Sequence, residues 1–197
     1  MLITFEGING CGKTSQIQYI QRYFTENTIK AVSVKEPSSL GGTIRRTLIE
    51  NTSIDPMTRL LLFQADRSEN VTKNIIPALQ DGNIVLCDRY IDSSVAYQVF
   101  GNGLDPLIIK ELNKISSHRI LPDITFFIDV PVEECQRRNG LRKDKSTRHK
   151  STYEYLASVR EGYLKLLRSN PKRIIQINGH KVFSEVSRDL IGMIRSH

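Results

Sequence analysis

The segment GINGCGKT, at residues 7–14, constrains the fold of this chain more than any other feature. It follows a short apolar run and precedes a segment of helical character, as expected of a phosphate-binding loop between a strand and a helix. The glycines let backbone N–H groups turn inward around phosphate oxygens, and the next helix directs its positive end to the same place. Lys13 can then reach the β- and γ-phosphates, and the Thr14 hydroxyl can bind Mg²⁺. The motif predicts a P-loop that binds the phosphates of a nucleotide.

Five short apolar runs, rich in β-branched residues, predict buried strands at residues 2–6, 31–34, 83–87, 124–130 and 173–177. Segments with helical spacing lie between them, and Asp55-Pro56 and Asp105-Pro106 each place an N-cap candidate before a proline suited to the first helical position. This alternation predicts an α/β fold of three layers, the P-loop NTPase fold, with a five-stranded parallel sheet flanked by helices. Ligands of such sheets bind at the carboxyl ends of the strands.

Composition and charge limit the class of protein. The chain has 197 residues, 39% of them hydrophobic and 25% charged, which suits a single globular domain over residues 1–197. No apolar run approaches the length of about 18 residues that a membrane span needs, and no signal peptide is visible. The three scattered cysteines suit neither a disulfide framework nor a zinc cluster, so we expect a cytoplasmic protein. The net charge of +7 fits nucleic-acid binding, a basic surface or a pocket for several phosphates.

Side chains elsewhere in the sequence fit a second phosphate and a base. Asp88 comes at the end of the third predicted strand, where a carboxylate can hold Mg²⁺ through water or orient a nucleophile. Arg89 follows it and offers a planar donor for a second phosphate. Phe63 and Arg67 stand four residues apart on one helical face, so they can stack a base and donate to its carbonyl group. A core position for Phe63 is an equally good interpretation.

The segment RRNGLRKDKSTRHK, at residues 137–150, is dense in cations and carries a single acid, Asp144. It fits a lid whose arginines close over transferring phosphates, and it also fits a solvated basic loop. No aromatic residue is interleaved there, although single-strand binding would favour one. We therefore favour a lid that handles phosphates over a surface that binds nucleic acid.

Six motifs together resemble the thymidylate kinase family over nearly the whole chain: FEGINGCGKT, KEP, IR, LLFQADR, DRYIDSSVAYQ and PDITFFIDV. The combination of LLFQADR with DRYIDSSVAYQ is the specific part of this resemblance. It implies transfer of the γ-phosphoryl group of ATP to dTMP with Mg²⁺, a step in dTTP synthesis, and we expect the transfer to be direct and in line. The resemblance further implies a homodimer that acts on ATP and dTMP, with no nucleic-acid or membrane partner.

The resemblance also implies roles for single residues. Phe63 would stack on thymine, Arg67 would bond its O4, and Tyr97 would lie close to the sugar. The dTMP-binding residues that it implies are Glu36, Arg45, Phe63, Arg67, Arg89, Ser94, Tyr97 and Gln98. The ATP-binding residues that it implies are Gly7, Ile8, Asn9, Gly10, Cys11, Gly12, Lys13, Thr14, Arg137 and Arg138. We expect Lys13, Asp88, Arg89 and Arg142 to be catalytic, and Thr14 and Asp88 to bind the metal.

Three segments depart from the family pattern. Asn9 stands where members often have Asp, and Gly10-Cys11 stands where some have Arg. Without a P-loop arginine the lid must supply a catalytic cation, for which the candidates are Arg137, Arg138, Arg142 and Arg148. The segment SSLGGT, at residues 38–43, replaces the usual Gly-Gly-Thr, and the lid lacks the usual Asp-Arg-x-Glu pattern.

Three other functions remain open on the residues. One is a kinase for another nucleotide or nucleoside, such as dUMP or dCMP. The second is an ATPase stimulated by nucleic acid, which the net charge of +7 would serve. The third is a nucleotide-binding regulator without activity.

Overall fold

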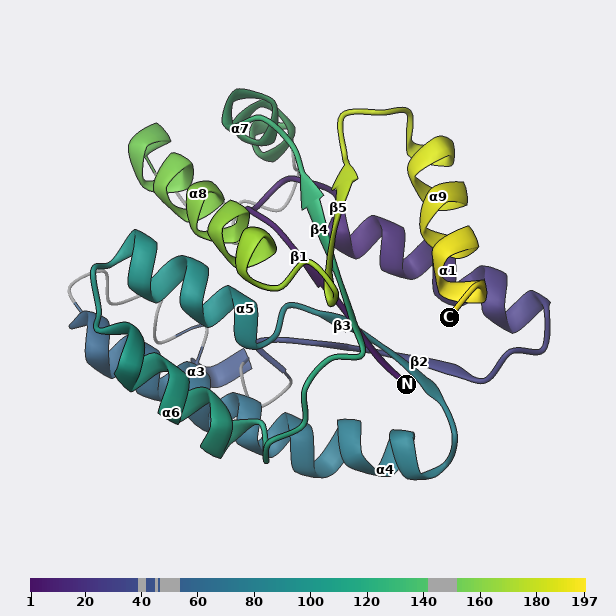
Figure 1. Ribbon diagram of the computed structural model, residues 1–197, viewed down its shortest axis with the longest axis horizontal. Coiled ribbons are helices and arrows are strands. Elements are labelled where there is room, and N and C mark those ends of the chain that lie inside the picture. Colours follow the sequence, from purple (N-terminus) through teal and green to yellow (C-terminus); the bar gives the residue numbers. More distant parts are fainter. Residues whose placement is uncertain (39–41, 45, 47–53, 142–151) are drawn as a thin grey trace.

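The computed structural model describes residues 1–38, 42–44, 46, 54–141 and 152–197. Its centre is a five-stranded, all-parallel sheet with the strand order β2-β3-β1-β4-β5 (Figure 1). The strands are β1 (Leu2–Glu6), β2 (Ala31–Lys35), β3 (Ile84–Asp88), β4 (Ile124–Asp129) and β5 (Ile174–Asn178). The predicted fold class is confirmed, and each predicted strand agrees with the observed one to within one residue at either end.

Helices connect the strands in the order that the sequence predicts. The α-helices are α1 (Lys13–Glu26), α3 (Pro56–Asn70), α4 (Ile76–Gln80), α5 (Ile91–Ser94), α6 (Pro106–Ser116), α7 (Val132–Gly140), α8 (Tyr153–Ser169) and α9 (Phe183–Arg195). Two π-helices, η1 (Val71–Ile75) and η2 (Val95–Gly101), continue α3 and α5. Both predicted caps are confirmed, because Asp55 accepts from the backbone N–H of Thr58 at 3.0 Å and Asp105 from that of Leu107 at 2.8 Å.

Helices cover both faces of the sheet. In Figure 1, α1 and α9 lie on one side of the strands, and α3, α5, α6 and α8 lie on the other. All five residues of β1 are buried, which fits its central place between β3 and β4. None of the described helices is long and apolar enough to cross a membrane.

The strand register brings the ends of β1, β2 and β3 together. Phe5 lies beside Asp88 in the sheet, and Lys35 lies on the other side of Asp88. The backbone N–H of Glu36 donates to the carbonyl oxygen of Asp88 at 3.0 Å. The three segments that follow these strands therefore meet at one edge, where ligands of parallel sheets bind.

Candidate active site

The loop at residues 7–14 lies tightly against β4 and α7. Gly10 has a φ of 95°, and a Cβ there would overlap the carbonyl oxygen of Cys135 in α7. Gly7 has a φ of 140°, and a Cβ there would lie 2.7 Å from the carbonyl oxygen of Ile128 in β4. Both positions exclude a side chain by conformation and by space. The glycine spacing of the motif is therefore a requirement of this close packing.

Lys13 begins α1 and turns its side chain back over the loop. Its ammonium group donates to the carbonyl oxygens of Gly7 at 2.9 Å and Ile8 at 3.1 Å, and to the sulfur of Cys11 at 3.5 Å. The residue is 5% exposed, so its charge lies inside the cradle that the loop forms. These contacts place a cation where the P-loop motif predicts phosphate groups.

Thr14 and Asp88 form an oxygen pair beside the loop. The Thr14 hydroxyl donates to Oδ2 of Asp88 at 2.5 Å, which joins the start of α1 to the end of β3. Hydroxyl and carboxylate oxygens are ligands that Mg²⁺ prefers, and this ion usually takes its other ligands from phosphates and water. Within the described ranges no group of three or more His, Cys, Asp and Glu side chains could hold a metal. The Thr14 and Asp88 oxygens are ligands of the kind that would fit Mg²⁺.

Arg89 follows β3 in a left-handed backbone conformation, with a φ of 75°. Its Nη2 donates to Oδ1 of Asn9 at 2.6 Å and to the Tyr97 hydroxyl at 3.2 Å. Its Nη1 donates to the hydroxyls of Ser93 at 3.1 Å and Tyr163 at 3.4 Å. All four acceptors are neutral, and no carboxylate of the described residues forms an ion pair with Arg89.

Arg89 keeps its positive charge at this site. Burial alone would lower the pKa of Arg89, but Tyr97, Tyr163 and the carboxylates of Asp88 and Glu6 raise it more, so the net direction is upward. The guanidinium stays protonated, and the side chains that accept its hydrogen bonds are neutral. An anion such as a phosphate can therefore bind it without displacing a carboxylate.

Arg67 lies in α3 and is only 2% exposed. Its Nε and Nη2 donate to Oε2 of Glu36 at 2.9 and 2.7 Å, and Nη2 also donates to the carbonyl oxygen of Tyr90 at 2.9 Å. Its Nη1 faces Asn113 at 2.7 Å, Ser94 at 2.9 Å and Gln64 at 3.3 Å. Three acceptors thus compete for the two hydrogens of Nη1.

Glu36 and Arg67 form a buried ion pair. Burial raises the pKa of Glu36 above its ordinary value, while the charge of Arg67 lowers it. Burial lowers the pKa of Arg67, but Glu36 raises it more, so its net direction is upward. Each charge of this pair depends on the other, because neither is exposed to water.

The side chains predicted to surround the base lie around this pair. Phe63 is half-buried and lies outside the buried core clusters, one helical turn before Arg67. Ser94 ends α5, and Tyr97 and Gln98 lie in the π-helix η2, a widened geometry common at functional sites. Gln98 is buried and accepts from Asn102 at 2.7 Å, and the Tyr97 ring lies 5.0 Å from the guanidinium carbon of Arg89.

Comparison with known proteins decides the family. Residues 5–190 match the sequence model of the family described as Thymidylate kinase. The chain belongs to the thymidylate kinase family. A thymidylate kinase from Thermoanaerobacter sp. (strain X514) is 36% identical over 198 residues, which cover 99% of this chain and 97% of that protein. One from Chlorobaculum tepidum is 38% identical over 209 residues, which cover 98% of this chain and 96% of that protein.

A solved structure supports the same assignment. The crystal structure of thymidylate kinase from Ehrlichia chaffeensis superposes with a TM-score of 0.80 at 34% identity, and 98% of each chain is covered. The predicted resemblance to thymidylate kinases, and the prediction of an enzyme of this family, are confirmed.

Two residues of the segment predicted to be a lid lie in a helix. The sequence predicts a lid or loop from residue 137 onward, but α7 (Val132–Gly140) includes Arg137 and Arg138. Arg137 and Arg138 donate to Glu134 at 2.7 Å, and Arg138 also reaches the carbonyl oxygen of Gly179 at 3.3 Å. These pairs three and four residues apart stabilise the last turn. Arg45, Arg142 and Arg148 lie outside the described residues.

Several side chains of the site do not stand out in the family motifs. Gln64 and Asn113 hold Arg67, and Glu6, Ser93 and Tyr163 surround Arg89. One signal for Glu6 exists in the sequence, since a carboxylate ends an otherwise apolar strand. Gln64 lies within the LLFQADR motif, whereas Asn113 and Tyr163 lie in helices where nothing local distinguishes them.

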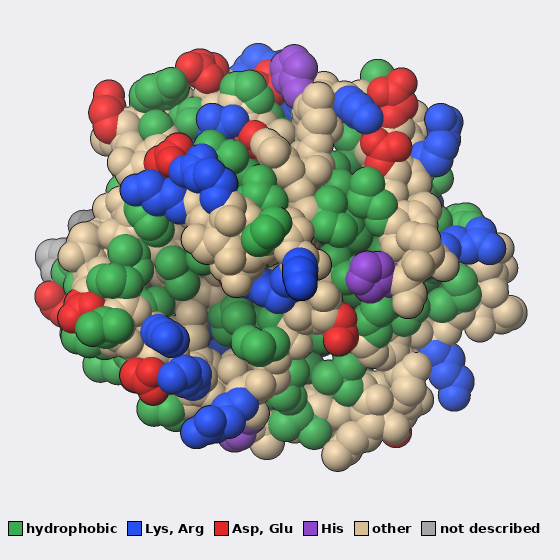
Figure 2. All heavy atoms as spheres, in the orientation of Figure 1, with side chains coloured by type: hydrophobic (Ala, Val, Ile, Leu, Met, Phe, Trp, Pro, Cys, Tyr) green, Lys and Arg blue, Asp and Glu red, His purple; other side chains and the backbone are tan. Residues whose placement is uncertain are grey.

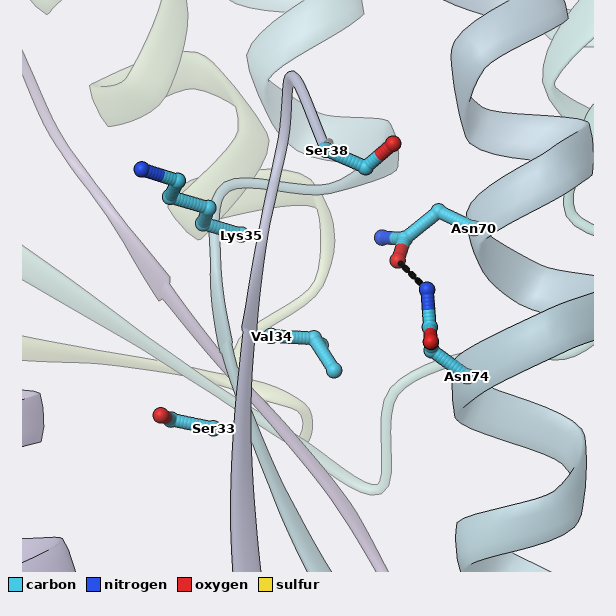
Figure 3. A pocket seen from close by; sticks show the side chains of 6 residues that line it. All are labelled: Ser33, Val34, Lys35, Ser38, Asn70 and Asn74. Atoms are coloured by element: carbon cyan, nitrogen blue, oxygen red, sulfur yellow. Dashed lines mark hydrogen bonds between the residues drawn. The ribbon is translucent and has the colours of Figure 1, made fainter. Parts of the chain in front are cut away.

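A pocket of about 180 Å³ lies beside β2, one of the two edge strands (Figure 3). It is lined by Ser33, Val34, Lys35, Ser38, Asn70 and Asn74, none of them a predicted site residue. Asn70 accepts from Nδ2 of Asn74 at 2.9 Å. This pocket borders Glu36 in sequence but does not include it, so we assign it no part in nucleotide binding.

Proposed function

We propose that this chain transfers the γ-phosphoryl group of ATP to dTMP, with Mg²⁺ as the metal. The observation that carries the proposal is the 2.6 Å hydrogen bond from Arg89 to Asn9. In this hydrogen bond, a cation that forms no ion pair within the described chain lies directly against the loop proposed to bind nucleotide phosphates. A second phosphate held by Arg89 would therefore lie next to the phosphates of ATP, as phosphoryl transfer requires.

The pocket for the base supports a pyrimidine with a carbonyl group. Phe63 offers a partly open ring for stacking, one turn from Arg67. Nη1 of Arg67 has more acceptors than hydrogens, so a thymine O4 can replace one protein acceptor without breaking the pair with Glu36. Ser94, Tyr97 and Gln98 complete the proposed surroundings of dTMP.

In-line transfer would rest on positioning and electrostatics. Lys13 would neutralise charge on the transferring group, Asp88 would orient the acceptor, and Arg89 would hold the acceptor phosphate. Mg²⁺, held by Thr14 and Asp88, would supply charge neutralisation on the phosphates of ATP. Arg137 and Arg138 would contact ATP from α7, and Arg142 is the proposed lid cation.

Lys13→Ala tests the proposed role of the P-loop. We expect kcat to fall by about 100-fold or more, because the cation that faces the transferring group is lost. Circular dichroism and thermal unfolding should match the wild type, because Lys13 forms no ion pair with a described carboxylate. Turnover near that of the wild type would remove Lys13 from the mechanism.

A substrate panel tests the proposed function itself. ADP release is measured with dTMP, dUMP, dCMP and thymidine, and separately with DNA and RNA as possible activators. We expect the highest kcat/KM with dTMP and no stimulation by nucleic acid. A preference for another monophosphate would correct the substrate. ATP turnover that needs nucleic acid and falls steeply with salt would replace the proposal.

We also propose that two copies of the chain associate through α3 and α6. Leu107, Ile108 and Ile115 on α6 and Leu61 on α3 are exposed, and Ile108 and Ile115 share one helical face. In Figure 2, hydrophobic side chains reach the surface among Lys and Arg on the side where α3 and α6 lie in Figure 1.

Light scattering should give twice the chain mass, and Ile115→Glu should reduce it. A wild-type monomer at micromolar concentration would contradict this proposal.

A further inference from the structure

A hydrogen-bonded relay connects a buried carboxylate to Arg89. Glu6, the last residue of β1, is fully buried. Its Oε2 accepts from the hydroxyls of Ser93 at 2.6 Å and Tyr163 at 2.9 Å. Its Oε1 accepts from the backbone N–H groups of Tyr90 at 2.8 Å and Ser93 at 3.3 Å. Hydrogen-bond donors from other segments therefore bind both oxygens of the Glu6 carboxylate.

The carboxylate fixes the direction of these hydrogen bonds. The Ser93 and Tyr163 hydroxyls also lie 2.9 Å from each other, but an ionised carboxylate can only accept, so a hydroxyl that bonds to Glu6 directs its proton toward Glu6. Their lone pairs then face Nη1 of Arg89, which lies 3.1 Å from Ser93 and 3.4 Å from Tyr163. The negative charge of Glu6 thus orients the acceptors of Arg89 without touching the guanidinium.

We propose that Glu6, Ser93 and Tyr163 are positioning residues that hold Arg89 for the acceptor phosphate while leaving its charge free. This inference rests on the proposed function, in which Arg89 binds the phosphate of dTMP. A carboxylate in direct contact would fix the guanidinium equally well, but it would compete with the phosphate for the same donors. The hydroxyls of Ser93 and Tyr163 fix the position of the guanidinium and leave its charge available to the phosphate.

The Tyr163 ring is itself held from two sides. It stacks on Phe127 of β4 with 5.2 Å between ring centroids and an interplanar angle of 18°. It also meets Tyr97 edge to face at 6.4 Å and 82°. Because the ring is fixed by packing, its hydroxyl is a fixed point for both Glu6 and Arg89. Tyr163 comes from α8, so this helix takes part in positioning the acceptor cation.

Binding of dTMP and of thymidine to single variants tests this role. Calorimetry is run at pH 8.5, above the pKa of Glu6 of about 7, with Tyr163→Phe, Ser93→Ala and Glu6→Gln. Since Arg89 meets only the phosphate, we expect each variant to weaken dTMP binding by about threefold to tenfold and to leave thymidine binding unchanged. Glu6→Gln should have the largest effect, because the amide can donate to the hydroxyls and reverse their direction.

Tyr23→Phe is the matched control. It also removes a hydroxyl that accepts from an arginine, Arg195 at 3.2 Å, but on the α1–α9 side of the molecule. It should change neither affinity. If Tyr163→Phe weakens the binding of dTMP and of thymidine equally, the role of Tyr163 is merely structural and the inference is overturned. Unchanged dTMP binding in Tyr163→Phe would also overturn it. If Glu6→Gln does not fold, Tyr163→Phe decides alone.

Arg89→Lys separates this inference from the proposed function. Arg89→Lys should abolish the preference for dTMP over thymidine. If it does so while Tyr163→Phe, Ser93→Ala and Glu6→Gln do not reduce that preference, only the relay is wrong. If the wild type binds dTMP no better than thymidine, the phosphate site at Arg89 is wrong, and the relay is overturned with it.

Discussion

Arg67 and Arg89 lie on the same side of the sheet and are held in opposite ways. Arg67 is paired directly with Glu36 at 2.7 Å, whereas the side chains that accept from Arg89 are neutral. A paired arginine has little charge left to attract an anion, but it keeps directed donors for a neutral group. An unpaired one keeps its full charge. The difference supports the proposal that Arg67 contacts an uncharged base and Arg89 a phosphate.

The backbone supports the same distinction. Arg67 lies in the regular helix α3, but Arg89 has a φ of 75°, a region that costs a non-glycine residue about 1–2 kcal/mol. Its backbone N–H is fixed by the carbonyl oxygen of Phe5 at 3.1 Å. Such conformations persist where the surrounding structure holds them, and they gather at functional sites.

Arg89→Ala should have the largest effect on catalysis. We expect kcat/KM for dTMP to fall by about 1000-fold, because the cation proposed to hold the acceptor phosphate is lost. The thermal midpoint should change little, because no described carboxylate is left unpaired at that side chain. Steady-state kinetics and thermal unfolding measure both quantities. A large loss of stability with normal kinetics would mean that Arg89 resembles Arg67.

Arg67→Ala should show the opposite pattern. Removing it leaves the Glu36 carboxylate buried and unpaired, which we expect to lower the free energy of unfolding by about 3–5 kcal/mol. Binding of dTMP should weaken as well. Adding Glu36→Gln should restore part of the stability, because the unpaired charge is removed. Urea unfolding of the single and double variants measures these changes. An Arg67→Ala variant with the same free energy of unfolding as the wild type would contradict the buried ion pair.

Glu6→Gln tests the carboxylate behind Arg89 through pH. Burial, aided by the charge of Asp92, raises the pKa of Glu6 from 4.5 to about 7. Between these values the folded state binds more protons than the unfolded state, so rising pH lowers the stability of the wild type. We expect the wild type to lose about 3 kcal/mol relative to Glu6→Gln from pH 4.5 to 7.5. Parallel pH dependences of unfolding in the two proteins would contradict this burial.

Asn9→Asp should have the smallest effect, and it tests directly whether Arg89 must stay unpaired, unlike Arg67. The new carboxylate would take the place of the neutral Asn9 amide at 2.6 Å from Arg89 and convert it into a paired arginine. We expect KM for dTMP to rise about threefold to fivefold, with unchanged KM for ATP. Tighter dTMP binding in this variant would show that the free charge of Arg89 is not needed.

The sequence predicts the parts of the site that are contiguous. The P-loop carries its chemistry within residues 7–14, and the strands are recognisable because apolar, β-branched runs fill a sheet buried on both faces. The caps at Asp55 and Asp105 follow from a single dipeptide each. Such features need no knowledge of residues far away in the chain.

The networks around the two arginines could not be predicted in this way. Glu6 and Tyr163 stand 157 residues apart, and only the packing of α8 on the sheet brings their oxygens together. The end of α7 was missed because the cations of Arg137 and Arg138 suggest a loop, while their pairing with Glu134 is a helical contact. The predicted roles of Arg45 and Arg142 stay predictions, since both residues lie outside the described ranges.

A crystal structure with dTMP and a non-hydrolysable ATP analogue tests the central claim most directly. We predict the dTMP phosphate within hydrogen-bond distance of the Arg89 guanidinium, the thymine ring against Phe63, and the phosphates of the analogue inside the loop at residues 7–14. A dTMP phosphate bound away from Arg89, or a thymine ring that does not contact Phe63, would contradict the account.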